Sequence, residues 1–124
     1  MELEKAAYLC ITERGVKGFN LGAVAEQAGT AKGTIHHYFL NKEELFEGVV
    51  RYGNREFGQT AITLIKAARS PCDRVWSIIS LYFDDKFFQP MISRAYVFAL
   101  TIGIRYEGVL RIYNANHARI ASQL

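Results

Sequence analysis

The sequence has few of the residues that cross-link or interrupt a chain. Only two of its 124 residues are cysteine and only two are proline. Cys10 and Cys72 stand alone, in no spacing typical of a disulfide framework or a zinc site, so we interpret them as core residues in a reducing cytoplasm. Because 50% of the residues are apolar, we expect a folded and mostly regular chain.

Long apolar runs and strand patterns are also missing. The longest apolar run, AYVFALTIGI over residues 95–104, is half of the roughly 20 residues that span a bilayer, so we interpret it as a buried helix. The N-terminus has early acidic residues and no apolar run typical of a secretory signal. No strand-type alternation persists for more than a few residues. The sequence therefore predicts an all-α protein of the cytoplasm with no membrane partner.

Positive charge is scarce in the first part of the chain. The formal net charge of the whole chain is +3, which favours a nucleic-acid partner. However, residues 1–50 hold five Lys and Arg against seven Asp and Glu, whereas residues 51–124 hold ten against five. Bulk charge therefore does not predict DNA binding by the opening segment, and any such prediction depends on local geometry.

Cap residues and apolar periodicity predict about seven helices. Asn20, Asn41 and Ser70 are good N-caps, and Asn41 forms a capping-box pattern with Glu44. The expected helices are Glu2–Arg14, Asn20–Gly29, Ala31–Phe39, Asn41–Ala68, one opening at Ser70, one beginning at Pro90, and a last one with the stripe Val109, Ile112, Tyr113 and Ile120.

The adjacent histidines His36 and His37 have three interpretations: metal ligands, solvated surface residues or part of a contact surface. Adjacent helical residues point about 100° apart, whereas one metal needs ligands three or four residues apart on one face. Neighbouring sequence supplies no third ligand, so no metal site is predicted. On the same expected helix, Ile35, Tyr38 and Phe39 share an arc that we expect to face the core.

The segment before the histidines favours a contact surface. Small Ala25 permits close approach of another helix, Gly29 permits the left-handed backbone of a tight turn, and Ile35 can pack back onto Ala25. This spacing is typical of a helix-turn-helix, whose second helix enters the DNA major groove. The predicted outward face of that helix comprises Lys32, Gly33, Thr34, His36 and His37.

These residues resemble the DNA-binding segment of TetR-family transcriptional regulators. The matching positions are Val24-Ala25, Ala28-Gly29, Lys32 to Ile35, Tyr38-Phe39, and Lys42 with Leu45. The resemblance implies a DNA-binding domain over residues 1–48 and part of a helical regulatory domain over residues 49–124. It also implies a homodimeric, ligand-released repressor that binds a palindromic double-stranded operator and a small-molecule effector.

We expect eight residues to contact DNA. Lys32, Thr34, His36 and His37 face the major groove, with Tyr38 at its edge, and Asn20 and Lys42 meet phosphates near helix starts. The predicted set is Asn20, Lys32, Gly33, Thr34, His36, His37, Tyr38 and Lys42.

The chain departs from the family pattern at several positions. Ala31 replaces a capping Ser or Thr, so the cap of the recognition helix either comes from Thr30 or is absent. His36 replaces a common Tyr and Leu40 a common Pro, and Gly22 adds flexibility near the start of the preceding helix. These changes affect the operator sequence, not the fold.

Aromatic residues recur on the expected helices of the second half. Trp76, Ile79, Tyr82, Phe83 and Phe87 share a broad apolar face, and Tyr96 and Phe98 follow in the next helix. We favour a core over a ligand pocket, since aromatic stripes are usually core. If a pocket exists, we expect it to be lined by Tyr82, Phe83, Tyr96 and Asn116.

Two stretches, IISLYFDD and RIYNANHARIASQL, weakly resemble the choline-responsive, betaine-pathway repressors of the family. The Trp-rich run of that branch appears here as AYVFAL, without tryptophan. An aromatic box would hold a quaternary ammonium by cation–π attraction. This ligand remains an alternative.

Two further classes of protein are alternatives to a DNA-binding repressor. No Ser/His/acid order, phosphate-binding glycine loop or carboxylate pair indicates an enzyme, and no cofactor is predicted. A shortened family member that sequesters full-length partners without binding DNA is the other alternative. The last apolar stripe continues to Leu124 without a stop signal, and TetR-like proteins usually carry two further dimerising helices. We therefore expect a truncated member whose last helices expose an apolar patch and whose dimerisation is in doubt.

Overall fold

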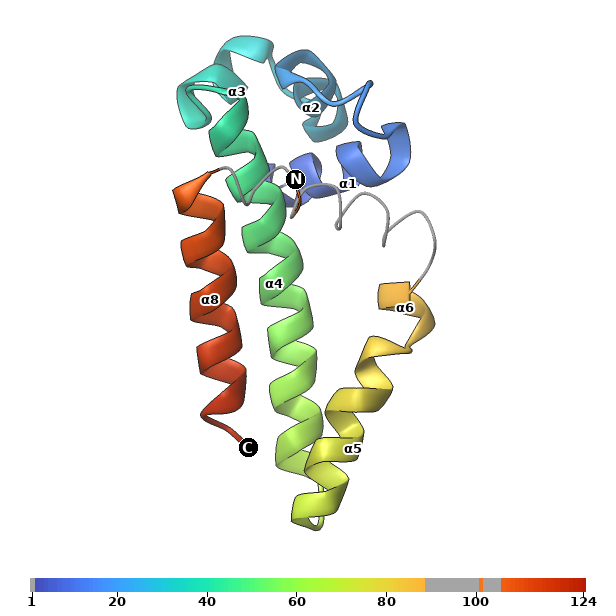
Figure 1. Ribbon diagram of the computed structural model, residues 1–124. Helices are drawn as coiled ribbons and strands as arrows, with labels where there is room; N and C mark the ends of the chain where they lie inside the picture. The colour runs from blue at the N-terminus through green and yellow to red at the C-terminus, as the bar shows by residue number, and fades with distance from the viewer. Residues whose placement is uncertain (1, 89–100, 102–105) are drawn as a thin grey trace.

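The computed structural model describes residues 2–88, 101 and 106–124, and within these residues the regular structure is helical (Figure 1). The all-α prediction is confirmed. The helices are α1 (Leu3–Arg14), α2 (Leu21–Ala28), α3 (Lys32–Tyr38), α4 (Lys42–Ala67), α5 (Pro71–Tyr82), α6 (Asp85–Phe88) and α8 (Glu107–Ala121). The short α6 was not predicted, and the helix expected from Pro90 lies outside the described residues.

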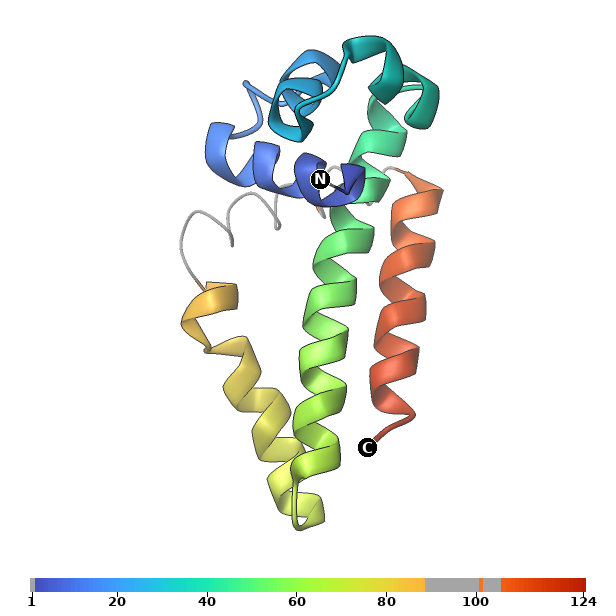
Figure 2. The ribbon, with the colours of Figure 1, turned by 180° about the vertical axis from the view of Figure 1, so that it is seen from behind.

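Helix α4 is the axis of the molecule. Helices α1, α2 and α3 gather around one end of it, and α5 and α8 pack along the rest of its length (Figure 1). Seen from behind, α1 lies across α4 (Figure 2). None of the helices described here is long and apolar enough to cross a membrane.

Side-chain caps start three of the helices where the sequence predicts them. The Oδ1 atom of Asn20 accepts a hydrogen bond from the N–H of Ala23 at 2.9 Å. Asn41 caps α4 in the same way through the N–H of Glu44, and the Glu44 carboxylate accepts the N–H of Leu40. Ser70 Oγ accepts the N–H of Asp73 at 3.1 Å and begins α5. Each bond satisfies a backbone donor that would otherwise lack an intrahelical partner.

The main hydrophobic core lies where α1, α2 and α3 meet the first part of α4. Its largest fully buried side chains include Phe19 and Phe46, whose ring centroids are 5.3 Å apart. Val109 of α8 joins this cluster, so α8 begins against the end of the molecule that carries α1, α2 and α3. A second, smaller cluster lies at the far end of α4 and consists of Ala61, Ile65, Leu81 and Ile120.

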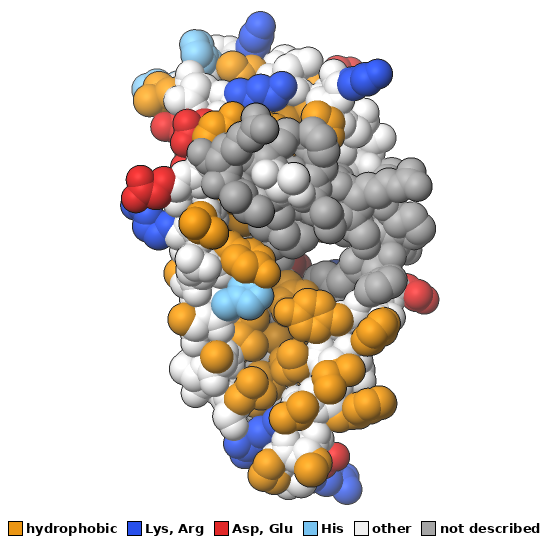
Figure 3. Space-filling view, in the orientation of Figure 1, with side chains coloured by type: hydrophobic (Ala, Val, Ile, Leu, Met, Phe, Trp, Pro, Cys, Tyr) orange, Lys and Arg blue, Asp and Glu red, His pale blue; other side chains and the backbone are white. Residues whose placement is uncertain are grey.

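The predicted core of α5 is wrong for most of its residues. Leu81 is buried, but Trp76 and Phe83 are each 68% exposed, and Ile79 and Tyr82 are 43% and 48% exposed. Figure 3 shows hydrophobic side chains on the surface of this half of the molecule. The physical reason is that α5 packs on α4 along one narrow stripe, and an apolar face wider than that stripe stays uncovered. The placement of Phe87, Tyr96 and Phe98 lies outside the described side chains.

Candidate nucleic-acid interface

Helices α2 and α3 are joined by a tight turn at Gly29. This residue has φ 69° and ψ 34°, a left-handed backbone that glycine adopts at little cost. The N–H of Thr30 closes the turn by donating to the carbonyl of Ala25 at 3.0 Å. Ile35 of α3 is fully buried in the same cluster as Val24 and Ala25 of α2. The turn and this anchor fix α3 across α2, as a helix-turn-helix requires.

The outward face of α3 is open to solvent. Every residue predicted to read DNA from this helix is exposed: Lys32, Gly33, Thr34, His36, His37 and Tyr38. A Cβ added at Gly33 would meet no atom within 4 Å, so another molecule can approach the backbone here. In Figure 3, side chains of the Lys and Arg class and of histidine lie at this end of the molecule. The face therefore offers donors suited to phosphates and to base edges.

The start of α3 resolves one question left open by the sequence. Its N-cap is Ala31, and no side chain, Thr30 included, caps the helix by a hydrogen bond. The bonds at this start come from the backbone, since the N–H groups of Thr34 and Ile35 donate to the Ala31 carbonyl at 3.0 and 3.4 Å. The cap residue usual in the family is therefore not replaced by a neighbour.

Tyr38 does not face the core. Its side chain is 67% exposed, whereas Ile35 and Phe39 on either side of the arc are buried. The core expectation for Tyr38 is therefore wrong, because α3 ends at this residue and the chain turns before Phe39 enters the core. The Tyr38 ring lies 6.1 Å from the Phe39 ring, at the junction between α3 and α4.

The two predicted phosphate contacts lie at helix starts. Asn20 is exposed, but its side-chain oxygen already caps α2. Its side-chain NH₂ group is therefore the part that can donate to a phosphate. Lys42 is exposed in the first turn of α4, immediately after α3. An ion pair between Arg14 of α1 and Glu26 of α2, at 3.0 Å, holds these helices together. The hydrogen bond to Glu26 raises the pKa of Arg14.

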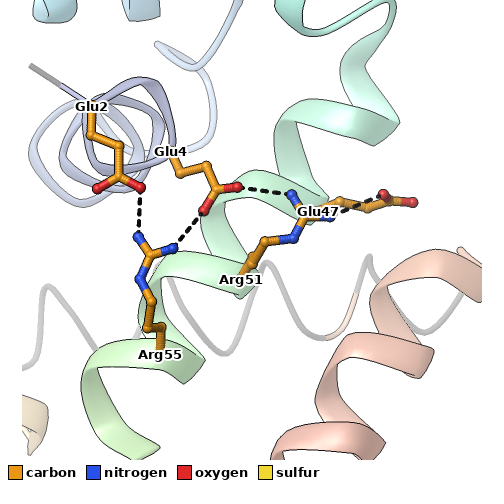
Figure 4. Close-up of polar contacts among 5 residues, drawn as sticks. All are labelled: Glu2, Glu4, Glu47, Arg51 and Arg55. Atoms are coloured by element: carbon orange, nitrogen blue, oxygen red, sulfur yellow. Dashed lines mark hydrogen bonds and ion pairs between the residues drawn. The ribbon is translucent and has the colours of Figure 1, made fainter. Parts of the chain in front are cut away.

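Sequence reasoning missed an ionic cluster between α1 and α4. Glu4 accepts hydrogen bonds from Arg51 at 2.9 Å and from Arg55 at 3.3 Å, and Arg55 also pairs with Glu2 at 2.7 Å (Figure 4). These pairs join residues about 50 positions apart, so no local pattern predicts them. The available signal was the charge asymmetry, with an acidic excess before residue 51 and a basic excess after it.

The four predicted ligand-binding residues are not shown to form one site. Tyr82 packs against Phe57 of α4 with ring centroids 5.0 Å apart, and burial raises its pKa. Phe83 is largely exposed, and Tyr96 lies outside the described residues. Asn116 is buried against α4, where its Oδ1 atom accepts a hydrogen bond from Arg119 and lies beside Gly58. The part of the chain that the structure describes contains no group of three potential metal ligands.

Helices α1 to α3 thus define a helix-turn-helix domain mounted on a long helix. Residues 4–49 match the family model described as bacterial regulatory proteins, tetR family. Over these residues the chain is similar to TetR-family regulators, and the resemblance found in the sequence is confirmed. The family and the relatives below are transcriptional regulators, not enzymes.

Related proteins match nearly the whole chain. The HTH-type transcriptional regulator BetI of Brucella canis is 28% identical over 123 residues, which are 99% of this chain and 62% of that protein. BetI of Rhizobium meliloti is 29% identical over 122 residues, which are 98% of this chain and 60% of that protein. The chain thus spans about three fifths of the length of these relatives.

Two solved structures share the fold. One is described as a transcriptional regulator from Pseudomonas aeruginosa, with a TM-score of 0.74 and 18% identity over 94% of this chain and 57% of that one. The other is described as a TetR-family transcriptional regulator from Mesorhizobium loti, with a TM-score of 0.71 and 19% identity over 98% of this chain and 61% of that one. At these identities the structures support the fold alone.

Proposed function

We propose that this chain is the DNA-reading part of a ligand-released transcriptional repressor. In this proposal α3 enters the major groove of a palindromic operator, and Lys32, Thr34, His36 and His37 meet base edges and nearby phosphates. Tyr38 lies at the groove edge, while Asn20 and Lys42 contact the backbone. The observation that carries the proposal is the buried Ile35 anchor combined with a fully exposed opposite face of α3.

Operator symmetry and the effector belong to the same proposal. Two copies bound to a palindrome place two recognition helices one helical turn of DNA apart, so specific binding needs a homodimer. The effector must bind the arrangement that separates the two DNA-reading ends more tightly than the arrangement that fits the operator. A quaternary ammonium effector stays a prediction, because it rests only on the weaker resemblance of the second half of the chain.

The test measures binding of the chain to DNA from the region beside its own gene and to random DNA of equal length. Lys42→Ala should weaken binding to both DNAs alike and lower the salt slope by about one. Thr34→Val or His37→Ala should instead reduce the preference for the specific DNA, by about 1–3 kcal/mol per lost base contact.

Matched controls lie on the same long helix, away from the proposed interface. Lys66→Ala and Thr63→Val change exposed residues near the other end of α4 and should leave both affinities unchanged. Equal losses from the base-reading and the phosphate-contacting variants would contradict the assignment of roles. Binding to neither DNA by a chain that light scattering shows to be dimeric would contradict the function itself.

A further inference from the structure

The ionic cluster between α1 and α4 continues toward α8. Arg51 donates from Nη1 to Glu4 of α1 at 2.9 Å, and its Nη2 lies 3.9 Å from the carboxylate of Glu47, one turn earlier on α4 (Figure 4). Arg51 therefore stands between two carboxylates, with Glu4 clearly the nearer partner. Both carboxylate side chains are mostly buried, with 19% of Glu4 and 23% of Glu47 exposed.

The Glu47 carboxylate occupies a niche that exists only because residue 108 is glycine. A Cβ at Gly108 would overlap the Glu47 carboxylate and would come within 2.6 Å of its Cδ atom. Gly108 is the second residue of α8, whose N-cap Tyr106 makes no side-chain cap bond. The uncapped N-terminus of a helix carries partial positive charge and attracts a carboxylate. The start of α8 thus holds Glu47 in a position where it pairs only loosely with Arg51.

From this geometry we propose that Glu47 is a positioning residue that couples the start of α8 to α1. While α8 holds Glu47, Arg51 remains paired with Glu4 and fastens the first turn of α1 to α4. When the start of α8 moves away, Glu47 turns to Arg51 and competes with Glu4 for it. Helix α1 is then held less tightly, and with it α2, through the Arg14–Glu26 ion pair. Only the consequence for DNA rests on the proposed function, since the coupling itself needs no DNA.

The expected effect is small, because Arg51 is 46% exposed and water screens its ion pairs. Hydrogen exchange of backbone amides detects changes of this size at single positions. The reporter is the first bonded turn of α1, where the Ala6 N–H donates to the Glu2 carbonyl at 2.9 Å.

The experiment compares two variants of the full chain. Gly108→Ala expels Glu47 toward Arg51, so exchange in the first turn of α1 should become about two- to fivefold faster, the range expected for a partly exposed ion pair. Glu47→Gln removes the competing charge, so exchange there should stay as slow as in the unmodified chain or become slower. In the Glu47→Gln background, Gly108→Ala should no longer accelerate exchange in α1, because its effect passes through the carboxylate.

Gly58→Ala is the matched control for Gly108→Ala. It also inserts a methyl group between α4 and α8, but there the group meets Arg119 and Asn116, which form a hydrogen bond with each other. It should leave exchange in α1 unchanged. The proposal is overturned if Gly58→Ala accelerates α1 equally, or if Gly108→Ala still accelerates it with Gln at position 47. If Gly108→Ala does not fold, faster exchange of α1 in Glu47→Gln alone overturns the proposal, and equal or slower exchange supports it.

DNA binding by the same variants separates this proposal from the proposed function. Coupling without any DNA binding, in a chain that light scattering shows to be dimeric, would refute the function and leave the coupling intact. Specific DNA binding, with equal hydrogen exchange in α1 of Gly108→Ala and Gly58→Ala, would refute the coupling and leave the proposed function intact.

Discussion

The two ends of α4 are packed in different ways. At the end that carries α1, α2 and α3, fifteen described hydrophobic residues are buried in one cluster. At the other end, beside α5, the described cluster has only four. Both ends are rich in apolar residues. The difference in burial therefore depends on how many helices pack around each end and on how these helices cross.

Three helices that cross one another bury more apolar surface than a single helix that packs along another. Ile35, Phe46 and Val24 are each covered from several sides by different helices. Helix α5 is covered only on the side that carries Leu81. Its larger side chains Trp76 and Phe83 remain exposed. Composition alone therefore does not decide burial, and the arrangement of neighbouring helices does.

Truncation of a large aromatic side chain should give the largest difference in lost stability between the two ends of α4. Phe46 is 2% exposed and packs against Phe19 and Tyr106, so Phe46→Ala should lower the free energy of unfolding by about 3–5 kcal/mol. Trp76→Ala removes a larger but 68% exposed side chain and should change it by less than about 0.5 kcal/mol. Denaturant unfolding followed by circular dichroism measures both values. A large loss in Trp76→Ala would mean that α5 is covered in solution.

Backbone strain at the turn between α2 and α3 should have the next largest effect. Gly29 has a positive φ, so Gly29→Ala should cost about 1–2 kcal/mol although no atom lies within 4 Å of the new methyl group. Gly33→Ala is the control, because Gly33 is helical and equally open, and it should stabilise α3 by up to about 1 kcal/mol. Equal effects of the two substitutions would show that the turn does not need a left-handed residue.

Loss of a helix cap should give the smallest and most local difference. Asn20→Ala and Ser70→Ala each remove one side-chain cap, worth about 1 kcal/mol. In Asn20→Ala the loss should appear in global unfolding, since α2 belongs to the large cluster. In Ser70→Ala it should appear mainly as faster hydrogen exchange of α5, which opens locally. A global loss of similar size in Ser70→Ala would show that α5 unfolds together with the rest.

Most helix boundaries could be predicted because their signals are local. Caps at Asn20, Asn41 and Ser70 act on a backbone donor three residues away, and the structure contains each of these bonds. The anchor Ile35 was equally predictable, since its spacing from Ala25 and Gly29 belongs to a compact motif. The candidate DNA-reading face followed from the same periodicity.

The failures occurred where burial depends on distant parts of the chain. Tyr38 shares an arc with Ile35, but the end of α3 turns its side chain to solvent. Trp76 and Phe83 have the pattern of a core without the neighbours that would make one. The sequence left open whether Thr30 caps α3 or the cap is absent, and in the structure it is absent, so this point is not a failure.

By itself, the sequence determined most of the described helices, the starts of the three with side-chain caps and the helix-turn-helix, because caps, turn glycines and apolar spacing act within a few residues. Only the tertiary structure decided which apolar faces are covered and which charges meet. The pairs of Glu4 with Arg51 and Arg55, and the niche at Gly108 that holds Glu47, join segments about 50 to 60 residues apart. Such contacts depend on how α1, α4 and α8 cross in space, and the physical reason is that helix crossing is set by the packing of the whole core rather than by any one segment.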